Sequence, residues 1–198
     1  MTAVSGAGVI LMSGDVQRGS VCSSDPVSAL IEELQFTLGE GPCIDAFSGQ
    51  RPVLESELAA APTRWPTFSP RAVDMGVHAI FGFPMVIGAA RIGALNLYRA
   101  EPGPLRAEQH ADALVLAGVA ARAVLAAQAG APPGALGPEL EASSDFRVVV
   151  HQAAGMVSVQ LDVSVAEALV RLRAYAYAND HSLNAVAQDV VARRLRFT

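Results

Sequence analysis

Two arginines and a tyrosine near the end of the sequence have the chemistry of a surface that binds anions or stacks bases. Arg171 and Arg173 flank Leu172, so one helix face cannot bury both of them. A guanidinium group donates a planar fork of hydrogen bonds, which suits a phosphate or the edge of a base in an open loop. Tyr177 adds an aromatic face on which an unstacked base can lie. The alternative interpretation of these side chains is a solvated helix face.

Polar residues earlier in the same region add hydrogen-bonding groups. Arg147, His151 and Gln152 precede Gly155 on a predicted helix. The imidazole and the amide can contact base edges, although an exposed polar face explains His151 equally well. Arg147 stands near a helix N-terminus, where a cation opposes the helix dipole and so favours an external anion. Glycine costs about 1 kcal/mol relative to alanine inside a helix. Close helix packing and close approach of a nucleic acid would each justify Gly155.

Charge distinguishes the two ends of the sequence only slightly. Residues 147–198 contain six arginines and four acids, a net +2, whereas residues 1–138 contain eight arginines and twelve acids, a net −4. A surplus of two positive charges is small beside the basic patches of dedicated nucleic-acid-binding proteins. Arg193, Arg194 and Arg196 cluster at the end of the last predicted helix, where they complement the helix dipole. We interpret this cluster as structural.

Four residues in the first part of the sequence are candidates for a sensor pocket. Cys43 follows a GEGP loop and can respond to redox state or hold a ligand covalently, while Trp65, Phe81 and Phe83 can line an apolar pocket. The alternative is a buried small hydrophobe and a packed aromatic core. The sequence contains no phosphate-binding glycine motif, zinc-ligand spacing or nucleophile–base arrangement. It therefore predicts no metal site and no catalytic site, and it identifies no cofactor.

Two domains and a linker must position these residues. The sequence has 198 residues, of which 52% are hydrophobic and 17% charged, enough for two folded cores. Residues 130–144, GAPPGALGPELEASS, are rich in proline and glycine and predict an extended linker. The expected organisation is a first domain at 1–129, the linker at 130–144 and a second domain at 145–198.

Mixed strand and helix patterns indicate that the first domain is α+β, with flanking helices around an antiparallel sheet. Gly88-Ala89-Ala90 separates two of the strand-like runs and predicts a hairpin. A helix is expected to begin after Asp25 as N-cap and to end near Gly39, and a longer one runs from Leu105 to Ala129. The strand-like runs are Gly8–Met12, Ser20–Ser23, Pro52–Glu55, Val77–Ile87 and Arg91–Tyr98. The stripes expected to be buried are Val27, Leu30, Ile31 and Leu34 on the first helix, and Leu114, Ala117, Ala121 and Leu125 on the second.

The second domain shows only helical periodicity, which predicts an all-α bundle of three helices. A capping box, Ser164 to Glu167, should open the middle helix, and Ser182 should cap the third. The expected apolar stripes are Phe146, Val149, Val150, Ala153 and Val157; Val165, Ala168, Leu169, Leu172 and Ala176; and Leu183, Val186, Ala187, Val190 and Val191.

These C-terminal residues resemble the ANTAR family of RNA-binding antitermination domains. The resemblance covers essentially Phe146 to Leu195, although the family often has lysine at the position of Ala154. The matching motifs are QAxG at Gln152–Gly155, Ser-x-x-Glu-Ala at the start of the middle helix, the pair Leu172-Arg173, and Leu183–Ala187. The candidate RNA-binding residues are Arg147, His151, Gln152, Gly155, Arg171, Arg173 and Tyr177.

The N-terminal residues are similar to the GAF domain family. The similarity covers about Val4 to Ala129 and includes LQFTLGEGPCIDAF, RWPTFSPRAVDMGVHAIFGFPMVI and GALNLYR. It implies a sensor domain with a possible small-molecule ligand, which the sequence does not identify. Together the two resemblances imply a homodimeric regulator whose GAF state controls ANTAR binding to paired stem-loops of a nascent transcript, favouring an antiterminator. This function needs no catalysis.

Two other functions fit the same patterns. A DNA-binding regulator would place the helix Leu183–Arg194 in the major groove as a helix-turn-helix, although the acidic Asp189 argues against it. A sensor that signals only through protein contacts would use the bundle for dimerisation.

Several features favour a cytoplasmic protein without a membrane span. Cys22 and Cys43 are too far apart for a local CxxC motif, and no basic residue precedes Arg18 as a signal peptide would require. The longest apolar stretch, residues 113–127, is interrupted by Arg122 and is shorter than the ~20 residues that cross a bilayer.

Overall fold

The structure is a computed structural model that describes residues 4–13, 16–60, 63–129, 138–179 and 181–198, without the side chains of residues 13–19 and 138–147. The chain divides into two compact units, Met1–Ser143 and Ser144–Thr198.

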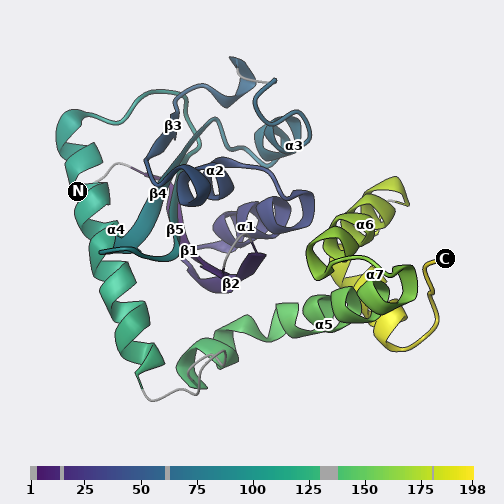
Figure 1. The fold of residues 1–198 in the computed structure, drawn as a ribbon. Coiled ribbons are helices and arrows are strands. Elements are labelled where there is room, and N and C mark those ends of the chain that lie inside the picture. Colours follow the sequence, from purple (N-terminus) through teal and green to yellow (C-terminus); the bar gives the residue numbers. More distant parts are fainter. Residues whose placement is uncertain (1–3, 14–15, 61–62, 130–137, 180) are drawn as a thin grey trace. The chain divides into compact units, whose positions relative to one another are not determined.

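The first unit is built on a five-stranded antiparallel sheet with the strand order β2-β1-β5-β4-β3 (Figure 1). The strands are β1 (Gly6–Ser13), β2 (Val16–Ser23), β3 (Val53–Glu55), β4 (Ala79–Ile87) and β5 (Ala90–Arg99). Each of the five predicted strands is confirmed. The predicted hairpin is confirmed as well, because Ile87 pairs with Ala90 across a tight turn in which Gly88 has φ +58°.

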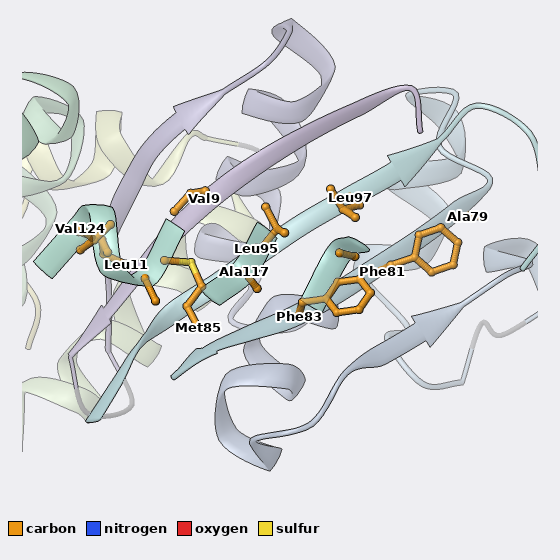
Figure 2. Packing of buried hydrophobic residues seen from close by; sticks show 12 residues of the cluster. Val9, Leu11, Ala79, Phe81, Phe83, Met85, Leu95, Leu97, Ala117 and Val124 are labelled. Atoms are coloured by element: carbon orange, nitrogen blue, oxygen red, sulfur yellow. The ribbon is translucent and has the colours of Figure 1, made fainter. Parts of the chain in front are cut away.

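One face of the sheet packs against the long helix α4 (Ala107–Gln128). Alternate residues of β1, β4 and β5 point to this face, as expected for a pleated strand. Figure 2 shows Phe81, Phe83 and Met85 of β4 beside Leu95 and Leu97 of β5 in this core. All five side chains are buried.

The buried stripe of α4 differs from the predicted one. The buried residues are Gln109, Ala113, Ala117, Ala121 and Val124, so Ala117 and Ala121 are buried as predicted. The predicted Leu114 and Leu125 are instead 43% and 41% exposed. Alanines let the helix backbone approach the sheet closely, so the contact line follows the small residues and leaves the leucines at its edge.

By length and composition, α4 also meets the requirements of a membrane span, with 22 residues and a mean hydropathy of 1.5. The segments Val148–Leu161 and Val165–Ala178 meet them only as a pair bent by 104°. These observations are weak evidence, because a core helix of a soluble domain has the same properties, and the buried stripe of α4 completes the core of the sheet. The absence of a membrane span stays a prediction.

The other face of the sheet is covered by α1 (Pro26–Leu38), α2 (Pro42–Gly49) and α3 (Phe68–Asp74), with a short 3-10 helix at Leu58–Ala60. Ile31 and Leu34 of α1 pack here, as predicted, whereas Leu30 is 50% exposed. The predicted ends of α1 are confirmed: Asp25 accepts a hydrogen bond from the Ser28 amide at 2.9 Å, and Gly39 ends the helix with φ +70°.

The second unit contains most of α5 (Pro138–Leu161), with α6 (Val165–Ala178) and α7 (Leu183–Val191). The predicted linker is wrong over residues 138–144, which belong to α5, while residues 130–137 lie outside the described residues. Pro138 occupies the first helical position, where a missing N–H costs nothing, and the ELEA that follows contains strong helix formers. Proline was therefore a sign of a helix start here.

The predicted caps of α6 and α7 are confirmed in part. Ser164 Oγ accepts from the Glu167 amide at 3.1 Å, and Ser182 Oγ accepts from the Ala185 amide at 3.1 Å. The reciprocal half of the capping box is wrong, because the Glu167 carboxylate accepts from Arg171 instead, at 3.1 Å.

Most of the predicted stripes form the core of this unit. Val165 is 49% exposed, Val149 and Val191 are only half-buried, and the side chain of Phe146 lies outside the described residues. The buried residues are Val150, Ala153, Ala154, Val157, Ala168, Leu169, Leu172, Ala176, Leu183, Val186, Ala187 and Val190.

Candidate functional site

The candidate residues of α6 lie on two flanks of the helix rather than on one face. Arg173 and Tyr177 are four residues apart and so share a flank. Arg173 is half-buried and Tyr177 is 54% exposed, so the tyrosine ring can receive a stacked base. Arg171 lies on the opposite flank in an exposed ion pair with Glu167, a kind of pair that contributes little to stability.

The candidate residues of α5 differ in accessibility. The side chain of Arg147 lies outside the described residues, although its backbone belongs to α5. His151 is half-buried, and Gln152 is exposed. Ala154, where the family often has lysine, is completely buried, so this position faces the core of the bundle.

Gln152 and Gly155 line an open groove with a volume of about 710 Å³ between α5 and the end of α7. We call it the α5–α7 groove. Its other lining residues, which the sequence analysis missed, are Met156, Val159, Gln160 and Val191. One signal was available in the sequence: Met156 and Val159 are apolar residues outside the expected buried stripe of their helix, and Val159 proves to be 83% exposed.

A second hollow of about 330 Å³ shares Met156 and Gln160 with the groove and is also lined by Arg193, Leu195 and Arg196. We call it the arginine hollow. The interpretation of the three arginines as purely structural is therefore incomplete. Only Arg194 has an evident structural role, because it pairs with Asp189 at 2.6 Å. Arg193 and Arg196 are exposed and form no ion pair among the described residues.

The four candidates for a sensor pocket lie in three separate clusters. Phe81 and Phe83 pack on the α4 face of the sheet, whereas Trp65 packs with α1 and α3 on the opposite face. Cys43 lies in a third cluster, with Phe47 of its own helix. These four residues do not line a single pocket, because Phe81 and Phe83 of β4 face α4 whereas Trp65 and Cys43 lie in the segments that cover the opposite face of the sheet. The alternative, that they fill the core, is the arrangement observed.

Trp65 and Cys43 each have a local role. The Trp65 Nε1 donates to Asp45 Oδ2 at 3.2 Å, and the Arg64 guanidinium lies 4.6 Å from the ring centre. Burial raises the pKa of the Cys43 thiol, and the nearby negative charge of Glu32 raises it further. Because the thiolate is the reactive form, the burial of Cys43 favours a small hydrophobic core residue over a redox or covalent centre.

A row of polar groups crosses the sheet beneath α1 and α2. Asn96 pairs with Gly8 on one side and Gly82 on the other, so all three positions face the same way. The Glu32 carboxylate lies over Gly8, and the backbone of Pro42 lies over Gly82. Glycines inside strands signal such close approaches, and this was the sequence feature that could have located the row.

Asn96 is fully buried, and neither polar atom of its side chain has a partner among the described residues. Gln35 is also fully buried; its Oε1 accepts from the Cys43 amide at 2.9 Å, and its Nε2 has no such partner. Unsatisfied buried polar atoms are uncommon in folded domains, and a bound ligand or water is the usual explanation.

Comparison with known families agrees with this division of the chain. A model of the GAF domain matches residues 2–125, and a model of the ANTAR domain matches residues 139–191. The chain belongs to the GAF family. Its C-terminal unit is an ANTAR domain, so both predicted assignments and the fold class are confirmed. No curated protein matches the chain.

Solved structures show the fold of the GAF domain. A GAF domain/HD domain protein from Geobacter sulfurreducens is 15% identical, with a TM-score of 0.52, over 67% of this chain and 87% of that one. A domain of a two-component sensor histidine kinase protein from Sinorhizobium meliloti 1021 is 19% identical, with a TM-score of 0.51, over 62% of this chain and 79% of the other. At such identities the likeness concerns fold alone.

The GAF and ANTAR domains are regulatory rather than catalytic families, and the pairing implies regulation of the ANTAR type. Among the described residues, no cluster of three or more His, Cys, Asp or Glu side chains could hold a metal ion. The chemistry that the site offers is therefore binding: stacking at Tyr177, amide hydrogen bonds at Gln152 and Gln160, and cationic groups at the arginine hollow.

Proposed function

We propose that this protein is a transcription antitermination regulator whose GAF domain controls binding of the ANTAR domain to stem-loops in a nascent transcript, in the cytoplasm and without catalysis. The observation that carries the proposal is the ANTAR match over helices that present exposed arginine, glutamine and tyrosine side chains. The free thiols of Cys22 and Cys43 are consistent with a reducing compartment.

Direct binding measurements test this function. At one fixed salt concentration the full-length protein should prefer hairpin RNA to duplex DNA of matched length, because salt otherwise dominates such comparisons. Arg173→Ala should weaken RNA binding roughly tenfold, the usual effect of removing one good nucleic-acid contact. Arg51→Ala, at an exposed arginine of the GAF domain, is the matched control.

Three outcomes would contradict parts of this proposal. Equal or tighter binding to duplex DNA would favour the helix-turn-helix alternative, with α7 in the major groove. Binding to neither nucleic acid would favour a sensor that signals through protein contacts. RNA binding that Arg173→Ala leaves unchanged would remove Arg173 from the site.

We propose that the protein acts as a homodimer through α4. The outer side of this helix carries exposed apolar side chains, including Val115 at 66% and Val119 at 48%. Apolar patches of this kind mark interaction surfaces in soluble proteins. A second copy of the same helix is a suitable partner, because the patch is mainly aliphatic: Leu114, Val115, Leu116, Val119 and Leu125.

Charge reversal of this surface tests the dimer. Val115→Glu should shift the protein from dimer to monomer, since two carboxylates would be buried at the symmetry-related contact. Light scattering coupled to size-exclusion chromatography measures the mass directly. Ala107→Glu, at the exposed start of α4, should leave the dimer intact. A monomeric wild-type protein, or a dimer that Val115→Glu does not disrupt, would contradict this interface.

We propose that the small-molecule ligand of the GAF domain contacts the polar row at Asn96 and Gln35. The support is that Asn96 has both an unsatisfied donor and an unsatisfied acceptor, and Gln35 has an unsatisfied donor, all in a buried position. A compact ligand with both donor and acceptor groups would satisfy them.

A further inference from the structure

Gly155 is a glycine in the interior of a helix. It lies inside α5 with helical backbone geometry, where glycine lowers helix stability relative to alanine. Apart from the adjoining backbone of α5, a Cβ atom added at this position would meet no atom of the described residues within 4 Å. Close helix packing therefore does not explain the glycine. The remaining explanation is that the space above Gly155, which is part of the α5–α7 groove, is used by something outside the described chain.

The lining of the groove indicates the chemistry of that occupant. Met156, Val159 and Val191 provide an apolar floor, and the polarizable methionine suits the face of a flat ring. Gln160 is held in a defined orientation, because its Oε1 accepts from the Phe197 amide at 2.9 Å. The Gln160 amide group is thereby left as a hydrogen-bond donor at the edge of the groove.

The tail that orients Gln160 is itself fixed. The ring of Phe197 lies edge-on to Tyr175 of α6, with the ring centres 5.4 Å apart. Amide groups that are held in place discriminate hydrogen-bond acceptors better than mobile ones do, because less entropy is lost on binding.

Positive charge lies beside the groove. Arg193 and Arg196 line the adjoining arginine hollow, which shares Met156 and Gln160 with the groove. The nearby acid Asp189 is already paired with Arg194, so it does not neutralise them. The apolar floor is complementary to the face of a base, and the fixed amide is complementary to the edge of that base. The adjacent guanidinium groups are complementary to its phosphate.

We propose that the α5–α7 groove receives one unstacked base of the RNA loop, with the Gln160 amide on the base edge and Arg193 and Arg196 on the flanking phosphates. This inference rests on the proposed function. It adds a base-binding subsite at Gly155, Met156, Val159, Gln160 and Val191.

The first test uses the full-length protein and a pool of hairpin RNAs with randomised loops. RNA enriched on the wild-type protein is used to measure the Kd of each variant at one salt concentration. Gly155→Leu, which places a branched side chain in the groove at the position of the base, should weaken binding roughly tenfold or more. Ala185→Leu, at an exposed position of α7 outside the groove, should leave the Kd unchanged.

Folding controls accompany this comparison. Gly155→Ala should raise the melting temperature of the ANTAR domain by roughly 4 °C, because alanine favours the helix and nothing obstructs its methyl group. The same variant should weaken binding less than Gly155→Leu does. A fall in the melting temperature would contradict the open space above Gly155.

The role of the two arginines is tested by the salt dependence of RNA binding. Arg193→Gln and Arg196→Gln should each weaken binding to all loop sequences and reduce the slope of log Kd against log salt by about one. Arg51→Gln should change neither quantity. Unchanged slopes in both variants would remove the arginine hollow from the subsite.

An abasic scan of the enriched loop locates the base. One abasic position should weaken binding by the wild-type protein roughly tenfold. In Gly155→Leu the same abasic position should have little further effect, because the base is already excluded. Fully additive losses, or groove variants that bind like the wild type, would overturn the subsite. Failure of the wild-type protein to enrich any RNA would instead contradict the proposed function.

Discussion

Gly82→Ala should lower the free energy of unfolding of the GAF domain by about 2–3 kcal/mol, the cost of forcing an extra methyl group into a packed core. A Cβ at this position would lie 2.5 Å from the carbonyl oxygen of Pro42 and 2.8 Å from its carbonyl carbon. These are backbone atoms at the start of α2, so no side chain can rotate away. Either α2 must lift from the sheet or β4 must shift within it.

Denaturant unfolding of the full-length protein measures this effect. Trp65 is the only tryptophan and is buried in the GAF domain, so its fluorescence reports the unfolding of that domain alone. Gly49→Ala is the matched control: its Cβ would come no closer than 3.6 Å to Arg51, and its backbone is helical. We expect Gly49→Ala to be neutral or slightly stabilising. Equal midpoints for the two variants would contradict the close approach of α2.

The same contact connects packing with the proposed ligand site. Gly82 lies beside Asn96 in the sheet, and Pro42 precedes Cys43, whose amide is bound by Gln35. A displaced α2 would therefore move the Cys43 amide away from the Gln35 Oε1 that accepts its hydrogen bond. We expect glycine at position 82 to matter for the shape of the polar row as well as for stability.

Local signals in the sequence predicted much of the fold. The caps at Asp25 and Ser182 and the turn at Gly88 depend on a few neighbouring residues, and each is confirmed. The start of α5 was wrong because proline and glycine in 130–144 were interpreted together, although Pro138 begins a helix.

Features that depend on tertiary packing were harder to predict from the sequence. Periodicity showed that α4 is amphipathic, but only the contact with the sheet decides that alanines rather than Leu114 and Leu125 are buried. The α5–α7 groove combines Gly155 with Val191, residues far apart in the chain, so no local pattern could predict it. The same holds for Asn96, which is buried beside glycines of two other strands.

The second large effect concerns Asp25, which joins α1 to the sheet. Its carboxylate accepts from the Ser24 hydroxyl at 2.6 Å, from both the amide and the hydroxyl of Ser28, and from the Tyr98 hydroxyl of β5 at 3.0 Å. Asp25→Ala should destabilise the GAF domain by about 2 kcal/mol at neutral pH, since a helix cap and a link to β5 are lost together. Asp25→Asn keeps a capping acceptor and should lose about half as much.

The pH dependence of the stability difference between the wild type and Asp25→Ala separates the effect of charge from that of packing. Burial by itself would raise the pKa of Asp25, but the hydrogen bonds from Ser24, Ser28 and Tyr98 outweigh it and hold the pKa well below its usual range. A carboxylate with a depressed pKa in the folded state stabilises the fold above its unfolded pKa of about 4 and loses that contribution as the pH falls further. The wild-type advantage over Asp25→Ala should therefore shrink when unfolding is repeated at about pH 3.

Tyr98 allows the same hydrogen bond to be tested at high pH. Burial, together with the hydrogen bond to Asp25 and the charge of that carboxylate, raises its pKa to about 12. A phenol whose pKa is raised in the folded state stabilises the fold below its unfolded pKa of about 10, and that contribution is lost as the pH rises towards 12. The advantage of the wild type over Tyr98→Phe should thus persist at neutral pH and fall at about pH 11. Because Asp25 and Tyr98 titrate at opposite ends of the scale, a wild-type advantage independent of pH in both comparisons would show that packing alone joins α1 to β5.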